Sequence, residues 1–358
     1  MKRFLYIFSL LFLILSLFTF CEQQTASYTD SANKNTTPEF KRSPSTSPDA
    51  TESATSGEIY IAVDESIAPL IQAELDNFQA VHEKAIVHAL IMPAEDAIRA
   101  MLLSDSIRLV ITTRKLNREE ENLLKALTVP PDYATLGKDA VAVIVNPENP
   151  TNQLKLDQLK AILSGEIKTW KDISGNSTAG NISLIFDHAR SGIISFLRDS
   201  LMDGKPLPEA STFALKNTEE VINYVAENPG ATGIVGMAWL SDKDDPKVLE
   251  RLKKIKILSL EKSAHTDNAC AYKQTFFGPF QSFLDQDCYP LTRKMYSISR
   301  ESGIGLGTGF VAYIDGPLGQ KIIHKSGLAA IHTIPRKVKF PEEETPPATT
   351  QQKPTTAK

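Results

Sequence analysis

Hydroxyl and guanidinium side chains follow predicted strands at two places in this sequence. Ser66 comes soon after a predicted strand that ends at Val63, and it can cap the helix that begins near Pro69. Thr113 and Arg114 follow another predicted strand, where they can donate a hydroxyl hydrogen bond and a bidentate guanidinium fork to an oxyanion. The ordinary alternatives are a helix cap at the first place and a surface arginine at the second.

Ser191 and Gly192 form a third such place, because their backbone N–H groups open a helix predicted for residues 193–201. His188 lies in the same loop, as either a ligand contact or a solvated side chain. The other histidines show no metal-ligand spacing, and no Ser-His-Asp order, nucleophile elbow or glycine-rich nucleotide fingerprint occurs. We therefore predict no catalytic residue, no metal site and no cofactor, and we expect that the protein is not an enzyme.

The elements that position these residues alternate between strands and helices. Helices separate the predicted strands, which cover residues 58–63, 85–91, 108–112, 139–146, 182–186 and 232–235. Such alternation implies an α/β protein with a mostly parallel sheet, on which ligands bind beyond the carboxyl ends of the strands. Residues 57–334 are too many for one core to form comfortably, so two domains are expected.

The composition is that of a globular protein. The 358 residues include 39 Lys+Arg and 43 Asp+Glu, which gives a net charge of −4, and 42% of them are hydrophobic. These values exclude a disordered chain, a disulfide-dense miniprotein and a basic nucleic-acid binder. We therefore expect no nucleic-acid partner.

The two ends of the chain differ from the body. Lys2 precedes an apolar run that ends at Phe20, which predicts a signal peptide over residues 1–20. Cys21 then resembles the acylated cysteine of bacterial lipoproteins, although Phe20 stands where a small residue is usual; an uncleaved anchor or a plain signal peptide is the alternative. Fourteen of the 35 residues from 22 to 56 are Ser or Thr, so we predict that residues 21–56 form a lipid-anchored tether. Residues 335–358 are predicted to form a disordered tail.

Several segments of the body resemble the phosphate-binding proteins of phosphate ABC transporters, and together they span nearly all of residues 57–334. The segments that carry the resemblance are Asp139–Pro150, Leu156–Ile173, Asn228–Gly236, Tyr289–Tyr296, Gly319–Ile323 and Ser326–Leu328. The resemblance implies a two-lobed type II periplasmic-binding-protein fold with two hinge crossovers, near Val143 and Tyr289. Lobe 1 would hold residues 57–145 plus 290–334, and lobe 2 would hold residues 146–289.

The resemblance also implies an anion site between the lobes. Phosphate sites of this family use helix N-terminal amides and hydroxyl groups, which can hold a buried anion without a large net positive charge. Carried over to this sequence, the ligand-binding residues would be Ser66, Ile67, Thr113, Arg114, Arg190, Ser191 and Gly192.

Two acidic residues depart from the family pattern. Glu65 stands where a second hydroxyl is usual, and Asp187 stands where the family has an arginine, which Arg190 could replace. A carboxylate inside an anion site adds repulsion of several kcal/mol unless it is protonated or turned away. Two alternatives follow from these acids: the site selects monobasic phosphate, or it has changed or lost its ligand.

The function that the resemblance implies is capture of inorganic phosphate and its delivery to ABC permease subunits. The protein would be a monomeric, extracytoplasmic lipoprotein, held at a bacterial membrane by the lipid on Cys21, on the periplasmic face or the cell surface. The alternative is a surface sensor or scaffold with the same fold that binds another oxyanion or no ligand. In an exported protein Cys270 and Cys288 can pair, but their spacing alone leaves that open.

Overall fold

The structure is a computed structural model that describes residues 52–126, 132–175, 178–208, 212–262, 270–301 and 303–332. The predicted signal peptide, Cys21 and the predicted tail from residue 335 lie outside the described residues, as does the predicted tether up to residue 51. The last residues of that tether pack on the body. The carboxylate of Glu52 accepts hydrogen bonds from Arg108 Nη2 at 2.7 and 2.8 Å and from the N–H of Leu306 at 3.1 Å.

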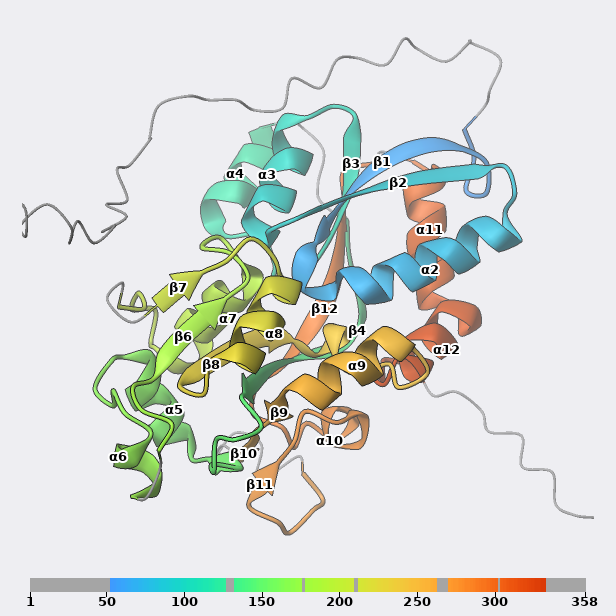
Figure 1. Cartoon of the computed structure of the whole chain (residues 1–358). Coiled ribbons are helices and arrows are strands. Elements are labelled where there is room, and N and C mark those ends of the chain that lie inside the picture. The colour runs from blue at the N-terminus through green and yellow to red at the C-terminus, as the bar shows by residue number, and fades with distance from the viewer. Residues whose placement is uncertain are drawn as a thin grey trace, which may run out of the picture. The chain divides into compact units, whose positions relative to one another are not determined.

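One half of the main sheet contains four strands that run in the same direction and one strand, β12, that runs opposite to them, in the order β2-β1-β3-β12-β4 (Figure 1). These strands are β1 (Gly57–Asp64), β2 (Ala85–Met92), β3 (Ile107–Thr112), β4 (Asp132–Val145) and β12 (Thr292–Ser299). Strand β1 pairs in parallel with both β2 and β3, while β12 runs antiparallel to β3 and β4. The carboxyl ends of β1 and β3 therefore lie side by side.

The other half continues from β4 through three further strands, in the order β4-β8-β6-β7. They are β6 (Ser183–Phe186), β7 (Thr212–Ala214) and β8 (Ala231–Gly236), with β9 (Lys256–Ile257) also on β4 and β13 (Ala329–Ala330) on its first part. A small separate sheet consists of β5 (Gln153–Leu154), β10 (Ser259–Glu261) and β11 (Phe276–Phe277).

Strand β4 belongs to both halves. Its first part pairs with β12 as far as Ala140, opposite Thr292, and its second part pairs with β8 from Val141, opposite Gly236. The segment that enters β12 crosses at the same level, because Tyr289 Oη donates to the Val141 carbonyl at 2.8 Å. Two adjacent chain crossings thus join the halves, as the two predicted hinge crossovers require.

Helices cover both faces of the sheet. They are α2 (Ala68–Val81), α3 (Ala94–Leu103), α4 (Arg118–Ala126), α5 (Leu156–Leu163), α6 (Lys171–Ser174), α7 (Gly192–Leu201), α8 (Thr218–Glu227), α9 (Pro246–Lys254), α10 (Gln281–Asp285), α11 (Leu306–Asp315) and α12 (Pro317–Lys325). In the first half, α3 and α4 lie on one face, and α2, α11 and α12 lie on the other (Figure 1).

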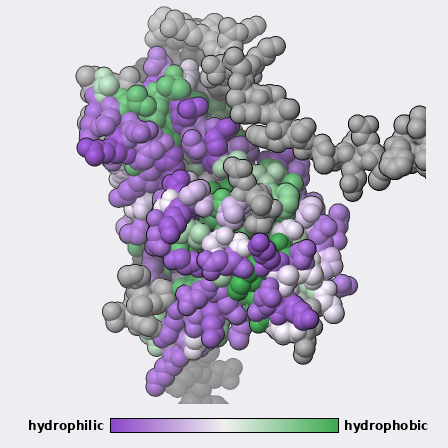
Figure 2. Space-filling view, turned by 90° about the vertical axis from the view of Figure 1, so that its left-hand side faces the viewer, coloured by the Kyte–Doolittle hydropathy of each residue, from purple (hydrophilic) through white to green (hydrophobic). Residues whose placement is uncertain are grey.

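Alternation along β1 explains the two layers, because successive side chains of a strand point to opposite faces. Ala62 belongs to the core cluster beneath α3 and α4, whereas Ile61 and Val63 belong to the main core with Phe78 and Phe310. Figure 2 shows the side of the molecule that carries α3 and α4, on which hydrophilic residues predominate and smaller hydrophobic areas lie between them. In the part of the chain that the structure describes, no helix is both long and apolar enough to cross a bilayer.

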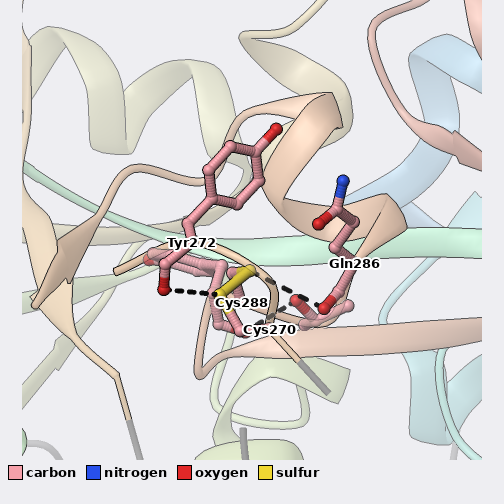
Figure 3. The surroundings of a disulfide bond; sticks show 6 residues. Cys270, Tyr272, Gln286 and Cys288 are labelled. Carbon is pink, nitrogen blue, oxygen red and sulfur yellow. Dashed lines mark hydrogen bonds between the residues drawn. A yellow bond between two sulfur atoms is a disulfide. The ribbon is translucent and has the colours of Figure 1, made fainter. Parts of the chain in front are cut away.

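Cys270 and Cys288 form a disulfide, with their Cα atoms 4.8 Å apart (Figure 3). Cys288 is fully buried and joins the main core. Nearby, the rings of Tyr272 and Phe283 meet edge to face with centroids 5.2 Å apart. The pairing that the sequence left open is confirmed.

Candidate functional site

The first loop of the site turns around a buried acid. Asp64 ends β1 and caps a short 3-10 turn, η1 (Glu65–Ile67), that leads directly into α2. Its Oδ1 accepts hydrogen bonds from the N–H of Ser66 at 3.0 Å and from Ser66 Oγ at 2.8 Å. Ile67 anchors the turn from below, since its side chain is fully buried in the main core.

The second loop donates to the other oxygen of the same carboxylate. Thr113 follows β3, and its N–H and Oγ1 donate to Asp64 Oδ2 at 3.2 and 2.7 Å. Because β1 and β3 are parallel neighbours, their ends bring residues 49 positions apart into contact. Asp64 therefore accepts four hydrogen bonds from two loops, and only 1% of its surface is exposed.

A buried arginine from β12 lies behind these hydroxyls. Arg293 Nη2 donates to Ser66 Oγ at 2.9 Å and Nη1 donates to Thr113 Oγ1 at 3.1 Å. Its Nε and Nη2 also donate to Asp139 Oδ2 at 3.0 and 2.7 Å. Each hydroxyl accepts a hydrogen bond from the guanidinium and donates one to Asp64. We call Ser66, Thr113, Asp139 and Arg293, grouped around Asp64, the Asp64 cage.

One guanidinium, that of Arg293, faces the two carboxylates of the cage. The side chains of Arg293 and Asp139 are 1% and 0% exposed. Burial raises the pKa of the Asp139 carboxyl, and the guanidinium and the N–H of Ala238 oppose that rise. A charge buried so deeply is stable only with such partners, because water cannot solvate it.

The third loop completes the site from the other half of the sheet. Ser191 caps α7, its Oγ accepting from the N–H of Ile193 at 3.1 Å. A methyl group added to Gly192 would lie 2.8 Å from Thr113 Oγ1 and 2.9 Å from Asp64 Oδ2. Only a glycine lets this helix approach so closely. The three loops that the sequence singled out therefore converge at one place.

A second acidic group lies beside the cage, which we call the Glu65 cluster: Glu65, Asp187 and Thr218. The Glu65 carboxylate accepts from the N–H and Oγ1 of Thr218 at 3.0 and 2.9 Å, at the start of α8. A side-chain hydrogen bond joins Glu65 to Asp187, which also accepts from the N–H of His188 at 2.9 Å.

The Glu65 cluster holds a proton at neutral pH. Burial, followed by the negative charge of Asp187, raises the pKa of Glu65 to about 8. Burial also raises the pKa of Asp187, although hydrogen bonds from Ser191 and Glu65 oppose this rise. The two carboxyls are therefore best described as a pair that shares this proton in the hydrogen bond between Glu65 and Asp187.

A family model described as a PBP superfamily domain matches residues 48–315 of the sequence. The chain belongs to the PBP superfamily. This membership and the solved structures described next confirm the predicted two-lobed α/β fold.

Relatives and structural neighbours agree with this membership. The phosphate-binding protein PstS of Staphylococcus aureus strain bovine RF122 / ET3-1 is 22% identical over 240 residues, which are 67% of this chain and 67% of that protein. PstS of strain USA300 is 23% identical over 193 residues, 54% of this chain and 56% of that protein.

Two crystal structures have a similar fold. One, from Clostridium perfringens, is described as a phosphate ABC transporter substrate-binding protein with bound phosphate; its TM-score is 0.62 at 17% identity, over 77% of this chain and 100% of that one. The other is an ABC-type phosphate transport receptor from Vibrio cholerae, with a TM-score of 0.56 at 18% identity, over 76% of this chain and 100% of that one.

Within this PBP-superfamily site, the two arginines named from sequence have partners outside the cage. Arg114 donates to both carboxylate oxygens of Glu120, at 2.7 Å each. Arg190 Nη2 lies 2.8 Å from Asp96 Oδ2, and its side chain is 53% exposed. The guanidinium that contacts the cage hydroxyls belongs to Arg293 instead. The described residues contain no cluster of His, Cys, Asp and Glu that could hold a metal ion.

Sequence reasoning did not assign roles to Asp64, Asp139, Thr218 or Arg293. A signal for Arg293 was present, since it lies in the segment Tyr289–Tyr296 that carried the family resemblance. It also shares a strand face with Met295 and Ser297, both buried, so an inward-facing cation could have been expected there.

Proposed function

We propose that this protein is an extracytoplasmic substrate-binding protein that captures inorganic phosphate between two lobes and delivers it to an ABC permease. The observation that carries the proposal is the convergence of three loops, from both halves of the sheet, on one position lined by hydroxyl and amide donors. Membership of the PBP superfamily and the names of the relatives in Staphylococcus aureus support the same function.

The chemistry of the site suits a small oxyanion. The hydroxyls of Ser66 and Thr113 are held in place by Arg293 and donate to Asp64, so an oxyanion that replaces this carboxylate would meet donors that are already oriented. Closure of two lobes around an anion gains contacts only in the closed state, which shifts the equilibrium toward closure. The nearby carboxylates of Glu65 and Asp187 favour a monobasic guest, because a P–OH group can donate to a carboxylate.

Calorimetric titration of the purified protein with phosphate, and with sulfate as the matched control, tests the proposal. Phosphate is expected to release or absorb heat with one-site stoichiometry, and sulfate, which carries no proton at neutral pH, is expected to bind more weakly. A protein that is folded by circular dichroism and shows no phosphate heat would contradict the proposal.

Lipid anchoring is part of the same proposal. A lipid on Cys21 would hold the protein, as a monomer, at a bacterial membrane while the tether gives the body reach. Metabolic labelling with a radioactive fatty acid is expected to mark the wild type and not Cys21→Ala. Equal labelling of both would place the lipid elsewhere or exclude it.

A second function, a surface sensor or scaffold that binds another oxyanion or none, is favoured by one observation. The donors of the Asp64 cage already end on a carboxylate of the protein itself. Small-angle scattering distinguishes the two functions, because a phosphate receptor is expected to become more compact when phosphate is added and a scaffold is not.

A further inference from the structure

Four donors from the first two loops are used by a single acid of the chain. Ser66 and Thr113 each contribute one N–H and one hydroxyl, and both oxygens of Asp64 accept two hydrogen bonds at 2.7 to 3.2 Å. A carboxylate held by two amides and two hydroxyls occupies the same kind of environment that proteins build for a bound oxyanion.

Packing around this carboxylate is tight on the side of the second half of the sheet. The Cα of Gly192 approaches so closely that an added methyl group would lie within 2.9 Å of both Asp64 Oδ2 and Thr113 Oγ1. At Gly236 an added methyl group would lie 2.2 Å from the Ser66 carbonyl oxygen. A tetrahedral oxyanion is larger than a carboxylate, so it cannot join Asp64 among these donors while they keep their positions.

Charge leads to the same conclusion. Arg293 donates directly to Asp139 and, through the two hydroxyls, supports Asp64, so one cation already serves two acids. The negative charge of Asp64 also acts on the nearby Asp187. Adding a guest anion to this group would place another negative charge in a buried site without another cation.

We propose that Asp64 is an internal anion that occupies the guest position of the cage, so that an external oxyanion enters only in exchange for its carboxylate. The proposal deepens the phosphate-binding function proposed above and rests on it for the identity of the guest. Asp64 thereby sets the affinity and the specificity of the site, because a guest must displace a ligand that is covalently part of the chain.

A route for this exchange borders the cage. An open cavity of about 400 Å³ is lined by Thr113 and Arg293 and also by Lys115 and Lys294. Lys115 Nζ lies 5.5 Å from the ring centroid of Tyr296, on the rim of the same cavity. Cations at such an entrance attract a small anion toward the donors of the cage.

The test is to remove the internal carboxylate and measure the affinity for added anions. Asp64→Ser takes away the charge and most of the side chain but leaves the Ser66, Thr113 and Arg293 donors. It is expected to bind phosphate at least about 100-fold more tightly than the wild type. Asp64→Asn keeps the cage filled and is expected to show a gain smaller than about 10-fold. Asp76→Ser, which removes an exposed acid of α2, is the matched control and is expected to bind as the wild type does.

Thermal denaturation provides a second readout, which also works if Asp64→Ser folds poorly. Formate and sulfate are expected to raise the melting temperature of Asp64→Ser, since each can replace the lost carboxylate, and to leave the wild type nearly unchanged at the same concentration. Phosphate is expected to raise the melting temperature of Asp64→Ser more than that of the wild type.

The outcomes separate this inference from the function on which it rests. Tight phosphate binding by the wild type that Asp64→Ser weakens or leaves equal would overturn the internal anion and keep the phosphate receptor. Binding or stabilisation of Asp64→Ser by formate or sulfate, with phosphate inactive on both proteins, would keep the internal anion and overturn the phosphate receptor. No response of either protein to any of the three anions would overturn both.

Discussion

The Asp64 cage and the Glu65 cluster are neighbouring groups of buried acids that are stabilised by different means. In the cage, a guanidinium with 1% of its side chain exposed contacts Asp139 and the hydroxyls that hold Asp64. In the Glu65 cluster, a proton on Glu65 and the first N–H of α8 reduce the repulsion from Asp187. A guanidinium keeps its charge at any physiological pH, whereas a proton leaves as the pH rises. Burial alone therefore does not decide how an acid is stabilised.

Removal of the cation is expected to have the largest effect. Arg293→Met keeps a long apolar side chain but leaves Asp139 buried without its partner, so the free energy of unfolding is expected to fall by about 3 to 5 kcal/mol. Urea denaturation measures the change. Arg190→Met, at a half-exposed arginine, is the matched control and is expected to change stability by less than about 1 kcal/mol. A loss below about 1 kcal/mol at Arg293 would show that the cage does not depend on its cation.

The geometry of the cage can be disturbed without changing any charge. In Gly236→Ala the new methyl group would lie 2.2 Å from the Ser66 carbonyl oxygen, so the turn that holds Asp64 must shift. The expected destabilisation is about 1 to 3 kcal/mol, measured by thermal unfolding. Gly303→Ala, where no atom lies within 4 Å of the new methyl group, is the control and is expected to be nearly neutral. Equal stability of the two variants would mean that the turn around Asp64 can shift without loss of the cage.

The Glu65 cluster, unlike the cage, is expected to respond to mild alkali. The folded pKa of Glu65, about 8, exceeds the ordinary value of 4.5, so the folded state binds this proton more tightly than the unfolded state. Its contribution to stability is complete below pH 4.5 and is lost as the pH rises toward about 8. Glu65→Gln mimics the protonated side chain and removes this dependence. It is expected to be more stable than the wild type by about 4 kcal/mol at pH 8, and by no more than about 1 kcal/mol at pH 5.

Glu74 also makes the free energy of unfolding fall as the pH rises, so the effect of Glu65 must be isolated by comparing Glu65→Gln with the wild type. Burial raises the pKa of Glu74 to about 9, and its carboxyl oxygens have no hydrogen-bond partner among the described residues. The difference between the pH profiles of the wild type and Glu65→Gln cancels this contribution. Parallel profiles would show that Glu65 is ionised throughout and would remove the contrast with the cage.

Much of the fold could be predicted because short apolar runs and helical spacing mark the elements locally. The predicted strand 58–63 became β1 (Gly57–Asp64), and the predicted helix 193–201 became α7 (Gly192–Leu201). Strand β4, however, begins at Asp132, seven residues before the predicted strand, because its first part is more polar and is held by β12 and β13.

The candidate site also contains residues that could be predicted from local sequence signals and residues that could not. Ser66, Thr113 and Ser191 could be predicted because strand ends and helix starts are local signals. The contact between Arg293 and Asp139, 154 positions apart, depends on how β12 and β4 pair, which local patterns do not reveal. The role of Asp64 was missed for another reason: a carboxylate that takes the place of a guest is indistinguishable from a turn cap until the second loop is seen to donate to it.

The smallest effect is expected at an ion pair on the same loop as Ser191, outside both acidic groups. Asp96 and Arg190 lie 2.8 Å apart, but their side chains are 26% and 53% exposed, so water screens their attraction. Asp96→Asn is expected to lower the free energy of unfolding by less than about 0.5 kcal/mol, and 0.5 M salt is expected to erase that difference. This pair joins α3 to the loop before α7. A loss above about 1 kcal/mol that persists in salt would show that the pair contributes as much to stability as a buried ion pair and helps to hold the three loops together.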